Sequence, residues 1–296
     1  MLTDLISALT LGSVYLLFAL GLSLAWGTIG ILNFAHGAIF MFSAFTGYLL
    51  VSHVALPMIV LVLIGVAVGA VMSVGVHVIA YEQIIKRAKD MQAAEMQILI
   101  GGIGIASIPL ALAQRETESN PFGFTGTTHQ VKLFVLGDVR ITDVQIIILL
   151  TALVLGTGVA LWLRRARAGL ALRGIGVDAE VAGMMGIDRR RFAILTMAVA
   201  GGMAGLAAVL FTFNLGAMIP ESGDTLMIKA FAVIILGGVG STLGVVVGAY
   251  FLAFAETGIL TYTGGTWVDA VSFGLILVVL LLRPNGLFGR KVVRRT

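Results

Sequence analysis

The chain has 296 residues, of which 59% are hydrophobic and only 11% charged, whereas an average soluble domain is roughly half apolar and a quarter charged. These proportions predict a protein that crosses a membrane several times. The net charge of +4 comes from basic residues grouped in loops, a pattern of membrane orientation that argues against nucleic acid as a partner. Cysteine is absent, which excludes disulfides, iron–sulfur clusters and zinc–thiolate sites, and no metal site is expected.

Seven apolar runs are long enough to cross about 30 Å of hydrocarbon as single helices, namely Ile6–Trp26, Ile29–Val51, Pro57–Ile79, Met96–Ala113, Ile141–Leu163, Phe192–Phe213 and Trp267–Leu282. The first lacks a basic start and a small-residue cleavage site, so it is interpreted as a retained span rather than a secretory signal. The connection between the first two runs is very short.

An eighth run, Leu226–Leu260, is too long for one span and is interrupted by Gly237, Gly238 and Gly240, which predicts two helices separated by a break. The basic segments at 81–92, 164–191 and 283–296 should all be cytoplasmic, and this holds only if the broken run crosses twice. The expected fold is therefore a single all-α transmembrane domain over residues 1–296, with about 8–9 transmembrane helices, one or two of them broken or re-entrant, and the N-terminus outside.

Small residues recur at four-residue spacing in Gly65–Ser73, Gly201–Gly205 and Gly240–Gly248, a pattern that lets membrane helices approach closely. The segment 114–140 is the largest predicted external loop. Within it, Val131–Thr142 alternates around Gly137-Asp138, as expected for a β-hairpin. Such a loop could meet an external partner or simply cover helix ends.

The segment 164–191 carries seven arginines at its two ends and is predicted to be a cytoplasmic loop around a short helix. Asp178, after a turn at Gly174–Gly176, can cap the helix, with Glu180 in its first turn and Gly186 at its end. Val181, Met184 and Met185 form one apolar stripe. The pattern fits a docking helix and a surface helix folded on its own protein equally well.

Polar residues at membrane depth are costly and mark candidate transport routes. The densest group is Asn33, His36 and Gly37, next to the short connection between the first two runs. Further polar residues are scattered through the apolar runs, and several of them lie within a turn of a predicted membrane surface, where their polar ends could reach water; they are His77, Gln97, Asn214, Lys229 and Glu256. The chain has no ATP-binding or hydrolase motif, so it is not expected to be an enzyme or to bind a cofactor. Energy must come from an ion gradient or a separate ATPase.

Four stretches carry a resemblance to a known family. They are GLSLAWGTIGILNFAHGAIFMFSAF (Gly21–Phe45), RARAGLALRGIGVDAEVAGMMGID (Arg165–Asp188), IKAFAVIILGGVGSTLGVVVGA (Ile228–Ala249) and LLRPNGLFGR (Leu281–Arg290). They resemble the permease subunits of branched-chain amino-acid ABC importers of the LivH type. Glu180, Ala182 and Gly186 also match the general docking motif of importers, although Val181 replaces an alanine and no Leu-Pro follows.

The resemblance implies a pore built with a second homologous permease, two ABC ATPases that bind the ATP, an extracytoplasmic substrate-binding protein, and a place in a bacterial or archaeal plasma membrane. Relatives with similar motifs import urea, short amides or aromatic acids, so these substrates remain alternatives to branched-chain amino acids. An ion-coupled secondary transporter is the alternative from another class. Such a carrier usually places a carboxylate near mid-membrane, and only Glu256 is a plausible one here.

Overall fold

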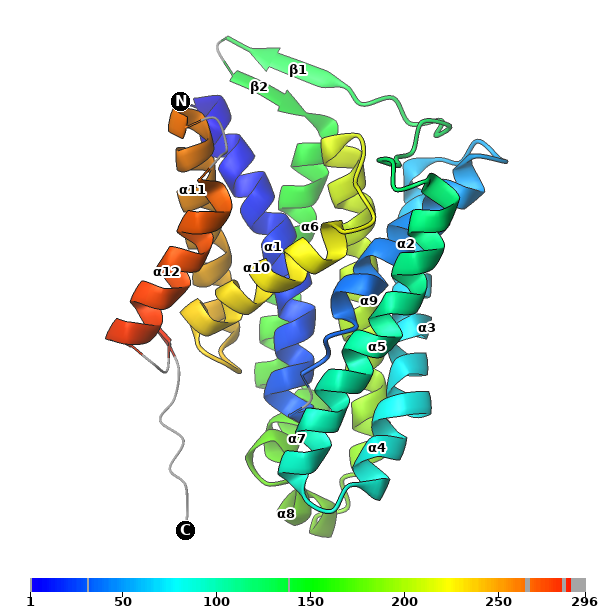
Figure 1. Cartoon of the computed structure of the whole chain (residues 1–296). Helices are drawn as coiled ribbons and strands as arrows, with labels where there is room; N and C mark the ends of the chain where they lie inside the picture. The colour runs from blue at the N-terminus through cyan, green and yellow to red at the C-terminus, as the bar shows by residue number, and fades with distance from the viewer. Residues whose placement is uncertain (1, 31, 138, 264–266, 284–285, 289–296) are drawn as a thin grey trace.

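A computed structural model describes residues 2–30, 32–137, 139–263, 267–283 and 286–288. They form a bundle of helices with one small β-hairpin at an end (Figure 1). The basic residues predicted in the tail at 290, 291, 294 and 295 lie outside the described residues.

The helices are α1 (Leu2–Ile29), α2 (His36–Val51), α3 (Met58–Val76), α4 (Glu82–Arg87), α5 (Met91–Thr117), α6 (Asp143–Arg165), α7 (Arg167–Val177), α8 (Ala179–Met184), α9 (Arg189–Leu215), α10 (Ser222–Gly237), α11 (Thr242–Thr263) and α12 (Val268–Leu282). A π-helical turn, His77–Tyr81, joins α3 to α4. The strands are β1 (Leu133–Leu136) and β2 (Val139–Thr142).

Six helical segments among the described residues are long and apolar enough to cross a membrane, so the chain is an all-α polytopic membrane protein. They contain α1, α3 with α4, α5, α6, α9 and α11. Helix α2 is shorter than the predicted span, because Gly30 has a φ of +73° at the end of α1 and the next helix begins only at His36. Its 16 residues cover about 24 Å.

Helices α1 and α9 are the most deeply buried of these spans. The predicted small-residue motifs explain how α9 packs: a side chain added at Gly69 of α3 would overlap the carbonyl oxygen of Gly201 of α9, and one at Gly205 would overlap the carbonyl oxygen of Gly65. In a membrane, such close backbone contact supplies the packing energy that water would otherwise provide through the hydrophobic effect.

The broken run forms two helices. Helix α10 ends at Gly237, Gly238 and Gly240 adopt φ angles of +96° and +77°, and α11 begins at Thr242. The end of α10 is completed by distant residues, since the N–H of Leu287 donates to the carbonyl of Leu236 (2.8 Å) and the N–H of Phe288 donates to that of Gly237 (3.0 Å). These residues belong to the RPNGLFG stretch, which therefore caps a helix about fifty residues earlier.

The predicted hairpin is present. Strands β1 and β2 pair antiparallel, with Leu136 opposite Val139, and Gly137, which follows β1, has a φ of +62°. The hairpin lies at one end of the bundle, together with the start of α1, while α7 and α8 lie at the opposite end (Figure 1). We refer to these as the hairpin end and the basic end.

Candidate functional site

The turn before α2 holds Asn33 in the interior of the bundle. The side-chain oxygen of Asn33 accepts a hydrogen bond from the hydroxyl of Tyr81 (2.7 Å) and another from the backbone N–H of Ala35 (3.1 Å). Its amide nitrogen Nδ2 is buried without a hydrogen-bond partner among the described residues. A buried donor without a partner costs about 1–3 kcal/mol.

His36, the first residue of α2, is completely buried. Its Nε2 lies 3.3 Å from the carbonyl oxygen of Phe18, and its ring packs on the Phe18 ring at 4.7 Å between centroids. The other ring nitrogen, Nδ1, has no partner within the described part of the chain. Asn33 and His36 therefore lie inside the protein rather than along an open cavity.

Gly37 lies where two short helices cross. A side chain added at Gly37 would come within 2.5 Å of the carbonyl oxygen of Gly223, and a side chain at Gly223 would overlap the carbonyl oxygen of Gly37. Both residues stand in the first turn of a 16-residue helix, α2 or α10. Two N-terminal helix ends, with their partial positive charge, are thus brought together in the bundle.

A buried ion-pair network joins four helices near the middle of α1. The carboxylate of Glu256 on α11 accepts hydrogen bonds from Lys229 on α10 (2.9 Å) and from the Tyr15 hydroxyl on α1 (2.6 Å) at one oxygen, and from Ser272 on α12 (2.6 Å) at the other. Lys229 also donates to the Tyr15 hydroxyl (3.0 Å).

Reaching water at a membrane surface, which was expected for several of the scattered polar residues, therefore does not apply to Lys229 or Glu256. Their side chains are only 14% and 3% exposed and pair with each other. A charge in hydrocarbon is tolerated when it is paired and hydrogen-bonded. The sequence signal for this pair was the presence of two opposite charges within the same apolar run, Leu226–Leu260.

Helix α8 is short and capped at both ends. At its start, a carboxylate oxygen of Asp178 accepts from the N–H groups of Glu180 and Val181, each at 3.0 Å. At its end, the N–H of Gly186 donates to Gly183 (3.0 Å) and that of Ile187 to Ala182 (3.1 Å). This is a Schellman motif, and it requires the φ of +83° that Gly186 adopts.

The apolar stripe of α8 is uncovered in this chain. Met184 and Met185 are 81% and 80% exposed and Val181 is 46% exposed, whereas Ala182 faces inward at 5%. The predicted turn at Gly174–Gly176 is wrong, because these residues continue α7 to Val177. The segment between α6 and α9 therefore folds into two consecutive helices, α7 and α8.

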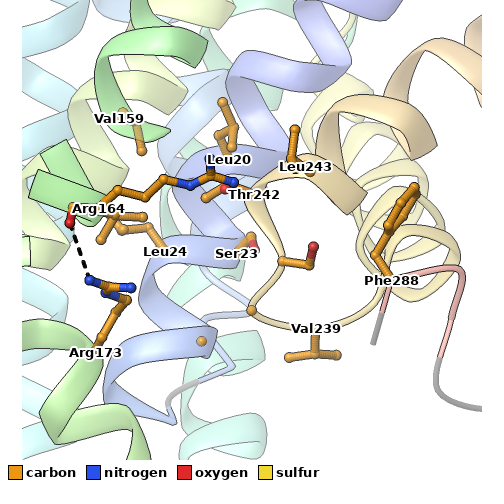
Figure 2. Close-up of a pocket in the computed structure, with 14 residues that line it drawn as sticks. Leu20, Ser23, Leu24, Val159, Arg164, Arg173, Val239, Thr242, Leu243 and Phe288 are labelled. Atoms are coloured by element: carbon orange, nitrogen blue, oxygen red, sulfur yellow. Dashed lines mark hydrogen bonds between the residues drawn. The ribbon is translucent and has the colours of Figure 1, made fainter. Parts of the chain in front are cut away.

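A pocket of about 330 Å³ lies at the basic end. It is bounded by the last turns of α1 and α6, by Arg173 of α7, by the α10–α11 turn and by Phe288 (Figure 2). Gly240 is in its wall, but Asn33, His36 and Gly37 are not. The structure thus places the predicted site residues in three separate regions: the α2 start, α8 and the α10–α11 turn.

Comparisons with known proteins cover almost the whole chain. Residues 5–280 match the family described as "Branched-chain amino acid transport system / permease component". The high-affinity branched-chain amino acid transport system permease protein BraD of Pseudomonas aeruginosa is 30% identical over 307 residues, covering 99% of this chain and 97% of BraD. LivH of Escherichia coli, described in the same words, is 29% identical over 306 residues, with the same shares covered.

A more distant relative is the probable branched-chain amino acid transport permease protein LivH of Methanocaldococcus jannaschii, 26% identical over 95% of this chain and 90% of its own length. No solved structure matches the chain. Because the family match extends over nearly all of the apolar bundle, the chain belongs to the permease component family of branched-chain amino acid transport systems.

Proposed function

We propose that the chain is a membrane-embedded permease subunit of an ABC importer that carries branched-chain amino acids into the cell. The observation that carries this proposal is the near full-length similarity to permeases named for that transport. The importer would lie in a bacterial or archaeal plasma membrane. It would contain a second homologous permease, two ATPases that bind ATP, and an extracytoplasmic binding protein.

The proposed topology has nine membrane segments: α1, α2, α3 with α4, α5, α6, α9, α10, α11 and α12. The N-terminus and the hairpin would lie outside, and α7 and α8 inside. The arginines of the basic end support this orientation. Single cysteines test it cleanly because the chain has none. An impermeant maleimide should label Ser119→Cys and Tyr262→Cys from outside, and Arg190→Cys only after the membrane is opened. A Tyr262→Cys that is labelled only from inside would mean that 226–260 crosses once.

Helix α8 is the proposed contact for the ATPases, through Asp178, Glu180, Val181, Ala182, Met184, Met185 and Gly186. Its exposed methionines support docking over the alternative of a helix folded on its own protein, since such a helix would bury its apolar stripe. Methionine suits this role because its flexible thioether side chain adapts to a partner's groove.

The proposed translocation route passes the start of α2, at Asn33, His36 and Gly37. Support comes from Asn33 Nδ2 and His36 Nδ1, two buried nitrogens that have no hydrogen-bond partner among the described residues, beside the crossing of two short helices. A small relative movement of α2 and α10 would expose these groups to a passing zwitterion. Glu256 is paired with Lys229, so it is not a free carboxylate in this structure, and the similarity to permeases of branched-chain amino acid transport systems favours the ABC importer over an ion-coupled carrier.

Reconstitution tests the function directly. Proteoliposomes that contain both permeases, the ATPases and the binding protein should accumulate radiolabelled leucine with internal ATP, and uptake should persist when ionophores collapse ion gradients. Urea, a short amide and an aromatic acid serve as competing ligands. Uptake that follows an ion gradient without ATP hydrolysis would refute the proposal, and uptake of urea but not leucine would refute the substrate.

A further inference from the structure

The pocket at the basic end combines an apolar wall with two cationic side chains. Leu20 and Leu24 of α1 and Val159 and Leu163 of α6 line it. In Figure 2, the side chain of Arg164 extends across the pocket toward Thr242. Arg173 lies below it and donates a hydrogen bond to the carbonyl oxygen of Arg164 at 3.4 Å (Figure 2).

Neither arginine is neutralised within the described part of the chain. The ion pairs found there do not include Arg164 or Arg173. The first turn of α11 adds partial positive charge on another side of the pocket. Ser23, Ser241 and Thr242 supply further polar groups in the wall, and the Ser241 oxygen accepts the N–H of Gly244 in that first turn (3.1 Å). Two guanidinium groups, three hydroxyls and the end of a 22-residue helix therefore surround one space. An anion would complete this arrangement.

The depth of the pocket indicates the kind of anion. Three candidate membrane spans, Leu2–Gly27, Asp143–Arg165 and Thr242–Thr263, all begin or end at it. It therefore lies at the boundary between hydrocarbon and headgroups. Leu243 in its wall is 53% exposed, and the exposed side chains of Val247, Phe251 and Phe254 continue from it along α11, so an apolar face of this candidate membrane span begins at the pocket. A water-soluble anion would use the arginines but not these apolar surfaces.

We propose that this pocket binds the phosphate group of an anionic phospholipid, with Arg164 and Arg173 holding the phosphate and the acyl chains lying along the exposed apolar face of α11 that begins at Leu243. Basic pockets between membrane helices on the cytoplasmic side suit such headgroups. The site is bounded by the α10–α11 turn and by Phe288, so a bound lipid stabilises the junction of α1, α6 and α11.

The test uses the purified permease in a neutral detergent. Phosphatidylglycerol is titrated against phosphatidylcholine while thermal unfolding is followed, and native mass spectrometry records the lipids retained. Phosphatidylglycerol should raise the unfolding temperature and be retained in preference. Arg164→Gln and Arg173→Gln should each raise the concentration needed for half the shift by about fivefold, from roughly 1 kcal/mol per basic residue. The control Arg167→Gln, at an exposed position of α7 outside the pocket, should behave as the wild type.

Three results would overturn the proposal. If Arg167→Gln weakened the response to phosphatidylglycerol as much as Arg164→Gln and Arg173→Gln, the effect would come from general surface charge and not from a site. If inorganic phosphate or glycerol phosphate raised the unfolding temperature as much as phosphatidylglycerol, the pocket would be a free-anion site with no role for the acyl chains. The retention of lipid by the wild-type protein gives a measurement that does not depend on any variant folding. Equal retention of the two lipids there would also reject the site.

Discussion

Replacing Lys229 by methionine breaks the ion pair inside the bundle and keeps a side chain of similar length. Glu256 then retains two donors, the hydroxyls of Tyr15 and Ser272, each at 2.6 Å. The complementary change, Glu256→Gln, leaves the ammonium group of Lys229 buried without a counter-charge. Removing one partner of a buried pair costs about 3 to 5 kcal/mol. We expect Lys229→Met near the lower figure and Glu256→Gln near the upper one.

The double variant, with Lys229→Met and Glu256→Gln, isolates the interaction energy between these two side chains from their interactions with the rest of the protein. Because neither charge is then left alone, its cost should fall below the sum of the single costs by at least about 2 kcal/mol. The assay is equilibrium unfolding in mixed detergent micelles, followed by tryptophan fluorescence. Lys132→Met, at an exposed lysine near the hairpin, is the control and should change stability by less than about 0.5 kcal/mol. Additive single costs would refute the reasoning.

Two further predictions concern the proposed contacts. Gly186→Val should abolish the stimulation of ATP hydrolysis by loaded binding protein, because a β-branched residue at φ +83° costs on the order of 1 to 3 kcal/mol. The control Gly183→Val should keep this stimulation, because Gly183 lies opposite the apolar stripe of α8 and has open space around it. Loss of stimulation in both variants, or in neither, would leave Gly186 without a special role. Asn33→Asp should reduce uptake more than Tyr81→Phe at equal amounts in the membrane, because Asn33→Asp removes Nδ2 but keeps an oxygen to accept from Tyr81 (2.7 Å) and Ala35 (3.1 Å), whereas Tyr81→Phe removes only the first of these bonds. Equal uptake would give Asn33 a purely structural role.

The positions of the long helices could be predicted from the sequence, because a long apolar segment in a membrane satisfies its own backbone hydrogen bonds only as a helix. The break between α10 and α11 was predictable for a similar reason: glycines tolerate the positive φ angles that Gly238 and Gly240 adopt. The start of α2 was not. Residues 29–35 are nearly as apolar as the helices around them, so hydropathy does not reveal that α1 ends and α2 begins inside the bundle.

The candidate site was predicted residue by residue but not as an arrangement. The caps of α8 are local, and Asp178 and Gly186 lie where their residue types favour them. The Gly37–Gly223 crossing and the bond of Tyr15 to Glu256 join residues far apart in sequence. No periodicity within one segment carries that information. Gly174 and Gly176 show the reverse error, since neighbouring residues kept them helical despite their low helix propensity.

The cap on α10 has a consequence for how the protein is made. The carbonyls of Leu236 and Gly237 receive their hydrogen bonds from Leu287 and Phe288, which the ribosome adds about fifty residues later. At 5 to 20 residues per second that interval is roughly 3 to 10 s. Throughout it, the end of α10 lacks two of its final partners. The turn at the basic end is therefore completed late in synthesis, after α11 and α12 have been added to the nascent chain.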